Sequence, residues 1–225
     1  MDISENMAGR KRKVDVYKTL KDAIQFLDFK PGAAVNEASL VAELGVSRTP
    51  IREALIRLSD EMLVDVFPQR GTYVSKINLN IAKEMAYMRH VMEMEICIDL
   101  CKNQADLSNL TGSTLHAMEY TIKQQDIVSY IKLDNEFHRL LFSVNGHEPI
   151  WNIISNTRAH YIRFLMLDMG FPNSLEESYL DHQKIVEYIL NGNKNELKKL
   201  LDAHHDHMTM KRESQIRKNH PEFIA

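Results

Sequence analysis

Four residues of metal-binding type interrupt the apolar stripes of three segments with helical periodicity. They are Asp134, His138, His182 and His204. A buried carboxylate is costly unless it is paired or coordinated, so a carboxylate among imidazoles points to a bound cation. Asp134 and His138 lie four residues apart, which lets both side chains reach one ion from adjacent helical turns. Three imidazoles and a carboxylate favour a divalent metal ion, Zn²⁺ first, with Ni²⁺, Mn²⁺ or Fe²⁺ as further candidates, and they leave coordination positions for water or a ligand.

A blander interpretation takes each histidine separately. A single histidine on an apolar face is usually a core residue with a satisfied hydrogen bond rather than a metal ligand. The grouping of four such residues favours the metal site over that interpretation. His205 and His207 lie next to His204 in the sequence and could replace it in the ligand set.

A second group of residues has the types and spacing that suit contact with DNA. Arg48, Thr49 and Arg52 point away from the core at the leading end of a predicted helix. Hydroxyls and guanidinium groups in that position suit phosphate oxygens and guanine edges. Arg70, at the tip of a predicted hairpin, could approach the DNA backbone. The alternative is a helical pair whose arginines are merely solvated.

A winged helix-turn-helix would place these side chains. The predicted elements are helices at about residues 12–27 and 39–44, a third helix capped by Ser47, and strands at residues 63–67 and 72–74. Ser39 and Asn36 compete as the cap of the second helix. Gly45 offers the left-handed conformation that ends it, and Pro50 fits the first turn of the third helix.

From residue 78 onward the chain shows helical periodicity without convincing strand alternation. The predicted helices cover residues 79–103, 107–124, 126–144, 149–168, 174–191 and 194–217. We therefore expect a mainly α protein with two domains. A winged helix-turn-helix DNA-binding domain would occupy residues 1–77, and an all-α bundle of about six helices would occupy residues 78–225.

The composition is that of a globular protein, with 225 residues, 44% hydrophobic and 26% charged. No apolar run approaches the roughly 20 residues of a membrane-spanning helix, and the N-terminus lacks the apolar core of a secretory signal. We therefore expect a cytoplasmic protein with no membrane partner. Cys97 and Cys101 have no nearby second pair and are expected to be small buried residues. Residues 1–76 carry 12 Lys and Arg against 11 Asp and Glu, so DNA binding must depend on local charge placement.

The run GVSRTPIREALIRL, followed by LV and PQRGTYV, resembles the winged-helix domain of GntR-type bacterial transcription regulators over about residues 12–76. The resemblance implies DNA contacts from the recognition helix and the wing, made by Ser47, Arg48, Thr49, Arg52, Gln69, Arg70 and Gly71. Two residues depart from the family pattern. Ala38 stands where a basic residue often adds a DNA contact. Met62 stands where the family usually has Gly, so Met62 would be strained if its φ is positive.

The helical module is similar to the metal-binding FCD effector domain of the FadR subgroup of GntR regulators. The resemblance is carried by Arg89 with Glu93, by the run Asp134-Asn135-Glu136-Phe137-His138, and by His182 and His204 at suitable separations. It implies a metal ion beneath a cavity that helps to hold a small organic acid. Arg89, Arg158 and Arg163 are the candidates for carboxylate recognition, because guanidinium binds carboxylate bidentately. Each could instead be ion-paired or solvent-facing.

Together these features predict a ligand-responsive transcription regulator. We expect a repressor that acts as a homodimer on a pseudo-palindromic operator in double-stranded DNA. A small carboxylate effector would complete the metal coordination and shift the population of DNA-binding arrangements. Two alternatives remain. One is a metal-dependent enzyme with an accessory DNA-binding head, although no base beyond the ligands is evident. The other is a regulator with a purely structural metal.

Overall fold

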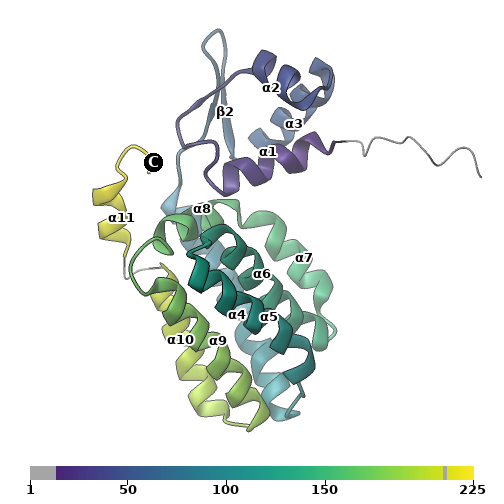
Figure 1. Ribbon diagram of the computed structural model, residues 1–225, viewed down its shortest axis with the longest axis vertical. Coiled ribbons are helices and arrows are strands. Elements are labelled where there is room, and N and C mark those ends of the chain that lie inside the picture. Colours follow the sequence, from purple (N-terminus) through teal and green to yellow (C-terminus); the bar gives the residue numbers. More distant parts are fainter. Residues whose placement is uncertain (1–13, 210–211) are drawn as a thin grey trace, which may run out of the picture. The chain divides into compact units, whose positions relative to one another are not determined.

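The computed structural model describes residues 14–209 and 212–225, and the side chains among them except those of residues 108–110 and 206–209. The chain divides into two compact units (Figure 1). The first comprises residues 28–75 and the segment up to residue 24, and the second comprises residues 25–27 and 76–225. The expected fold class, mainly α with an N-terminal winged helix-turn-helix and a C-terminal bundle, is confirmed.

The first unit is a winged helix-turn-helix with a three-stranded sheet. Its elements are α1 (Val16–Gln25), β1 (Ala34–Val35), α2 (Glu37–Leu44), α3 (Arg48–Asp60), β2 (Val64–Phe67) and β3 (Gly71–Val74). The strands are antiparallel in the order β1-β3-β2, and Val64 pairs with Val74. The buried face of α3 includes Ile51, Leu55 and Leu58. Two residues are too few to show alternation, so the sequence does not predict β1.

The turn between α2 and α3 is fixed by its flanking residues. Asn36 rather than Ser39 caps α2, because its Oδ1 accepts hydrogen bonds from the amides of Ala38 at 2.9 Å and Ser39 at 3.1 Å. Gly45 adopts a left-handed conformation with φ +63° and ends the helix, as the sequence predicts. Ser47 precedes α3 at the N-cap position, as the sequence predicts, but this exposed residue forms no side-chain capping bond.

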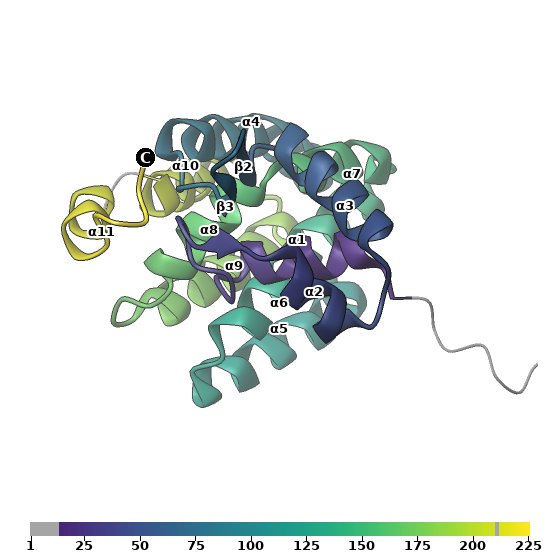
Figure 2. The same ribbon diagram turned by 90° about the horizontal axis from the view of Figure 1, so that it is seen from above.

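The second unit is a bundle of helices. Its elements are α4 (Leu79–Lys102), α5 (Ser108–Gln124), α6 (Ile127–Val144), α7 (Glu148–Thr157), α8 (Ala159–Asp168), α9 (Ser174–Leu190), α10 (Lys194–Thr209) and α11 (Glu213–Asn219). Helix α4 packs against α8, α9 and α10, and α5 packs against α6 and α9 (Figure 2). The buried faces of α4, α6, α9 and α10, which are mainly apolar but carry a few polar residues, line one interior.

Two of the predicted helices are divided in the structure. The segment 149–168 breaks at Arg158, which ends α7 and precedes α8. The apolar pattern continues across this single residue, so periodicity does not reveal the break. The predicted helix 194–217 corresponds to α10 and α11, and residues 210–211 between them lie outside the described part of the chain, as do residues 12–13 of the first predicted helix. The bundle therefore contains more than the expected six helices.

The C-terminal segment is fastened to the start of the bundle. Ile77 and Ile224 form a parallel β-bridge, in which the amide of Ile77 donates to the carbonyl of Phe223 at 2.8 Å and the amide of Ala225 donates to the carbonyl of Ile77 at 3.0 Å. Ile77 is fully buried. Cys97 and Cys101 are free and buried, as expected for core residues. Among the described residues, none of the helices combines the length and apolar character that crossing a bilayer requires.

Met62 adopts φ +59°, the left-handed region that favours glycine. We therefore predict that Met62→Gly raises the free energy of unfolding of the first unit by about 0.5–1 kcal/mol, because the strain is relieved. Thermal and urea unfolding of both proteins measure this change. Met62→Ala is the control, since it shortens the half-exposed side chain and retains the strain. Equal stability of the Gly and Ala variants would contradict the strain argument.

Candidate metal centre and nucleic-acid interface

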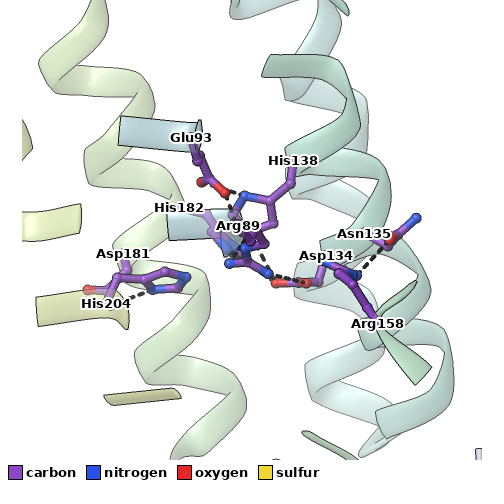
Figure 3. Close-up of polar contacts among 9 residues, drawn as sticks. All are labelled: Arg89, Glu93, Asp134, Asn135, His138, Arg158, Asp181, His182 and His204. Carbon is purple, nitrogen blue, oxygen red and sulfur yellow. Dashed lines mark hydrogen bonds and ion pairs between the residues drawn. The ribbon is translucent and has the colours of Figure 1, made fainter. Parts of the chain in front are cut away.

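Three helices bring the four predicted ligands together inside the second unit (Figure 3). Asp134 and His138 come from α6, His182 from α9 and His204 from α10, and all four are buried. One ring nitrogen from each histidine lies within 4.8 Å of those of the other two. Oδ1 of Asp134 is 3.5 Å from Nε2 of His138 and 3.4 Å from Nε2 of His182. The residues thus face a common centre.

The atoms that face this centre lack hydrogen-bond partners. Both carboxylate oxygens of Asp134, both ring nitrogens of His182 and Nε2 of His204 are buried without one. Such orphaned atoms are rare in folded proteins because their desolvation is not compensated. Ligand atoms that share one Zn²⁺ at about 2.0–2.2 Å lie roughly 3–3.5 Å from one another. The separations around Asp134 agree with that value, so this donor set fits a divalent metal ion.

Two carboxylates orient the imidazoles from outside the cluster. Nδ1 of His138 lies 2.7 Å from Oε1 of Glu93, and Nδ1 of His204 lies 3.0 Å from Oδ2 of Asp181. When Nδ1–H donates a hydrogen bond to a carboxylate, the lone pair of the ring is on Nε2 and faces the centre. Metal-binding histidines require this arrangement. Asp181 is a residue that the sequence does not single out, because it lies beside the apolar stripe of its helix.

The charges of the cluster keep its acidic groups ionised. Burial would raise the pKa of Asp134, but His138 and Arg89 hold that pKa well below its ordinary value. Burial likewise opposes ionisation of Glu93, yet the same two neighbours lower its pKa to about 2. Burial lowers the pKa of His182 well below its ordinary value, so this imidazole is neutral. Ionised carboxylates and neutral imidazoles are the forms that bind a metal ion.

Two of the three predicted anion-binding arginines lie beside the histidines. The guanidinium of Arg89 contacts Glu93 through Nε at 3.2 Å and His138 Nε2 through Nη2 at 3.1 Å. Arg158 donates from Nη2 to Oδ1 of Asn135 at 2.7 Å. Arg163 is also fully buried, on α8.

Arg158 is a fully buried cation with unused donors. Its Nε and Nη1 have no hydrogen-bond partner, and its guanidinium lies over the ring of Trp151 at 5.0 Å. Burial, reinforced by the charge of Arg89, lowers its pKa to about 10, so it remains protonated at neutral pH. A buried guanidinium with unpartnered donors is a binding group for a carboxylate.

A cavity of about 20 Å³ adjoins the cluster. Its lining consists of Ala86, Arg89, His90, Glu93, Tyr161, Leu201, His204 and His205. A cavity of this size holds about one or two water molecules. The ring of His205 stacks on that of His90 with centroids 4.5 Å apart, and it is His204 that joins the other two imidazoles. The side chain of His207, the other alternative ligand, lies outside the described residues.

The predicted DNA-contacting residues lie on the surface of the first unit. Arg48, Thr49 and Arg52 are exposed at the start of α3, and Arg70 is exposed at the tip of the wing. Arg48 and Arg70 line one groove of about 420 Å³, together with Gly71. The structure therefore brings the start of the recognition helix and the wing to one face of the unit.

Local contacts fix the backbone of the wing, and one of the arginines that could contact DNA has a carboxylate partner. Gln69 and Gly71 both have positive φ, at +61° and +103°, and the hydroxyl of Tyr73 donates to the carbonyl of Arg70 at 3.0 Å. Arg52 donates from Nε to Oε2 of Glu37 at 3.0 Å. This pair is exposed and therefore weak, so a phosphate could replace Glu37 at little cost. An exposed recognition helix beside a wing that carries an exposed arginine defines a DNA-binding protein of the winged-helix class.

Comparison with known proteins agrees with this class. Residues 12–74 match the family model described as bacterial regulatory proteins, gntR family, and residues 84–207 match the FCD domain. The chain belongs to the GntR family of bacterial regulatory proteins and carries an FCD domain. It is a DNA-binding transcriptional regulator and not an enzyme, and its curated relatives are named as HTH-type transcriptional regulators.

Two curated relatives and one solved structure illustrate the similarity. The chain is 29% identical to an uncharacterized HTH-type regulator of Streptomyces ambofaciens, over 82% of this chain and 78% of the relative. It is 28% identical to the HTH-type transcriptional repressor RspR of Escherichia coli K12, over 74% and 75% of the two chains. The structure of E. coli McbR/YncC has a TM-score of 0.70 at 20% identity, covering 85% of this chain and 92% of that one, and it shows the shared fold.

The contact between Asp181 and His204 leads to a prediction about metal affinity. Asp181→Asn should weaken Zn²⁺ binding by about tenfold, because the remaining amide holds the ring of His204 less firmly in the ligand tautomer. Competition with a chromophoric chelator measures the affinity. Glu196→Gln is the matched control, because Glu196 lies on α10 and pairs only with exposed Lys199. An unchanged affinity in Asp181→Asn would exclude this orienting role.

Proposed function

We propose that the protein is a repressor whose helical domain binds a divalent metal ion, Zn²⁺ first among the candidates, and a small organic acid that together control operator binding. One observation carries the proposal. The unpartnered oxygens of Asp134 and the unpartnered nitrogens of His182 and His204 face one point inside the bundle. The ion would be held by Asp134, His138, His182 and His204, and it would supply a Lewis acid to which a carboxylate can bind.

The organic acid is supported by the arginines rather than by the metal ligands. Arg158 has two buried donors without partners, and Arg89 lies within reach of the same cluster. A carboxylate accepts hydrogen bonds from two nitrogens of one guanidinium, so a small acid would satisfy Arg158 directly. Arg163 is retained as a third candidate for a larger ligand, because it too is fully buried in the same unit.

Operator control is supported by the two domains and by the names of relatives. RspR of E. coli and a gluconate operon regulator of Bacillus licheniformis are both named as repressors. We infer that this chain acts in the bacterial cytoplasm as a homodimer on a two-fold operator, since a two-fold protein presents two recognition helices to two half-sites. The acid must favour one arrangement of the DNA-binding domains over another in order to act.

The DNA-binding residues can be tested by substitution. Arg52→Ala should weaken binding to a DNA fragment from the gene's own upstream region by about 1–3 kcal/mol, because a base or phosphate contact is lost. Fluorescence anisotropy at several salt concentrations measures the loss. Arg217→Ala is the control, since Arg217 is an exposed arginine of the second unit. Equal losses in both variants would remove α3 as the recognition helix.

The metal and acid can be tested together on the wild-type chain. Citrate, lactate and acetate serve as probe acids, each titrated into metal-free and Zn²⁺-loaded protein by calorimetry. We expect at least one acid to bind the loaded form more tightly and to change operator affinity, and Arg158→Gln to abolish that binding while Zn²⁺ affinity persists. Equal acid binding with and without Zn²⁺ would leave the ion a structural role only.

A further inference from the structure

The guanidinium of Arg89 contacts Nε2 of His138, the ring nitrogen to which a metal ion would bind. Its Nη2 lies 3.1 Å from Nε2 of His138, and its Nη1 lies 3.8 Å from Oδ2 of Asp134 (Figure 3). Nδ1 of His138 is already bonded to Glu93, so Nε2 carries the only lone pair that this ring offers. One lone pair accepts one partner. The Arg89 contact and metal coordination by His138 therefore exclude each other.

The charge of Arg89 also opposes metal binding. Arg89 is 5% exposed, and the attraction between its charge and the carboxylates of Glu93 and Asp134 is little screened by water. A divalent ion bound to Asp134 would compete for the same carboxylate and would repel the guanidinium at short range. Arg89 must therefore leave His138 for the ion to bind, while its Nε can keep the contact with Glu93.

The surroundings of Arg89 indicate where the guanidinium can go. The guanidinium carbons of Arg89 and Arg158 each lie 5.7 Å from the ring centroid of Tyr161, so the two cations share one aromatic neighbour. Arg89 and Tyr161 also line the small cavity beside the histidines. A guanidinium that turns from His138 toward Tyr161 comes closer to Arg158, and two like charges at such a distance favour an anion between them.

We propose that Arg89 is an internal competitor of the metal ion, and that its displacement by the ion completes an anion site with Arg158. The inference rests on the proposed metal site and specifies how that site is regulated. Metal binds first and at a cost, because Arg89 must be moved. The anion then stabilises the displaced guanidinium, so metal and anion raise each other's affinity by the same factor.

The test compares Zn²⁺ affinity in three full-length proteins: wild type, Arg89→Gln and Arg139→Gln. Arg139 is the control, because it is a cation of α6 that pairs with Glu136 and Glu148 and is partly exposed. Without added anion, we expect Arg89→Gln to bind Zn²⁺ about tenfold or more tightly than wild type, since the competing cation is gone. Arg139→Gln should stay within about twofold of wild type, because the competition is intact.

Acetate provides the second part of the test. It should raise the Zn²⁺ affinity of wild type and fail to raise that of Arg89→Gln. Zn²⁺ affinity in Arg89→Gln equal to or weaker than wild type would overturn the inference while leaving the metal site in place. Absence of Zn²⁺ binding in all three proteins would instead remove the proposed function, and this inference with it.

A direct structural measurement guards against misfolding of the variants. Circular dichroism establishes whether Arg89→Gln is folded. Independently, a crystal structure of Zn²⁺-loaded wild type should show the guanidinium of Arg89 withdrawn from Nε2 of His138. A loaded structure that retains this contact at hydrogen-bond distance would overturn the inference without any variant.

Discussion

The burial of Asp134 is the constraint on which the helical domain depends. A carboxylate that is 2% exposed must be compensated, and the groups that lie nearest to it, Arg89, His138 and His182, come from α4, α6 and α9. Because the compensating side chains come from elements far apart in the chain, the polar cluster fixes how these helices face one another. The outer carboxylates Glu93 and Asp181 extend this effect by holding two of the imidazoles. The arrangement of the candidate metal ligands and the packing of these helices therefore depend on the same buried contacts.

The charge balance of this interior links a cation to an anion. Asp134 and Glu93 are ionised, Arg89 and Arg158 are protonated, and His182 is neutral, so these groups are close to balance. A divalent ion adds positive charge that the buried carboxylates no longer offset. In the proposed function, a small acid would restore the balance and accept hydrogen bonds from the unpartnered donors of Arg158. Ligand sensing would then follow from the electrostatics of this buried cluster.

The sequence predicts features that depend on local pattern and misses those that depend on the fold. Polar residues in apolar stripes and turn residues leave a periodic or local signal in the sequence. This signal predicts the four candidate ligands, the left-handed Gly45 and the recognition helix. The break between α7 and α8 at Arg158 cannot be predicted, because a single residue does not disturb the helical periodicity of the apolar residues. The pairing of Asp181 with His204 and of Arg52 with Glu37 depends on distances across helices, which spacing along the chain does not encode. Asn36 rather than Ser39 caps α2 for a similar reason, because the backbone geometry decides which of two suitable side chains reaches the free amides.

Anomalous diffraction from crystals of the protein grown with Zn²⁺ tests the central claim most directly. Data collected on either side of the zinc absorption edge locate the ion without reference to any variant or activity. The account predicts one strong peak inside the bundle, within coordination distance of Asp134, His138, His182 and His204. A peak only at surface residues, with those four side chains hydrogen-bonded to water alone, would contradict it.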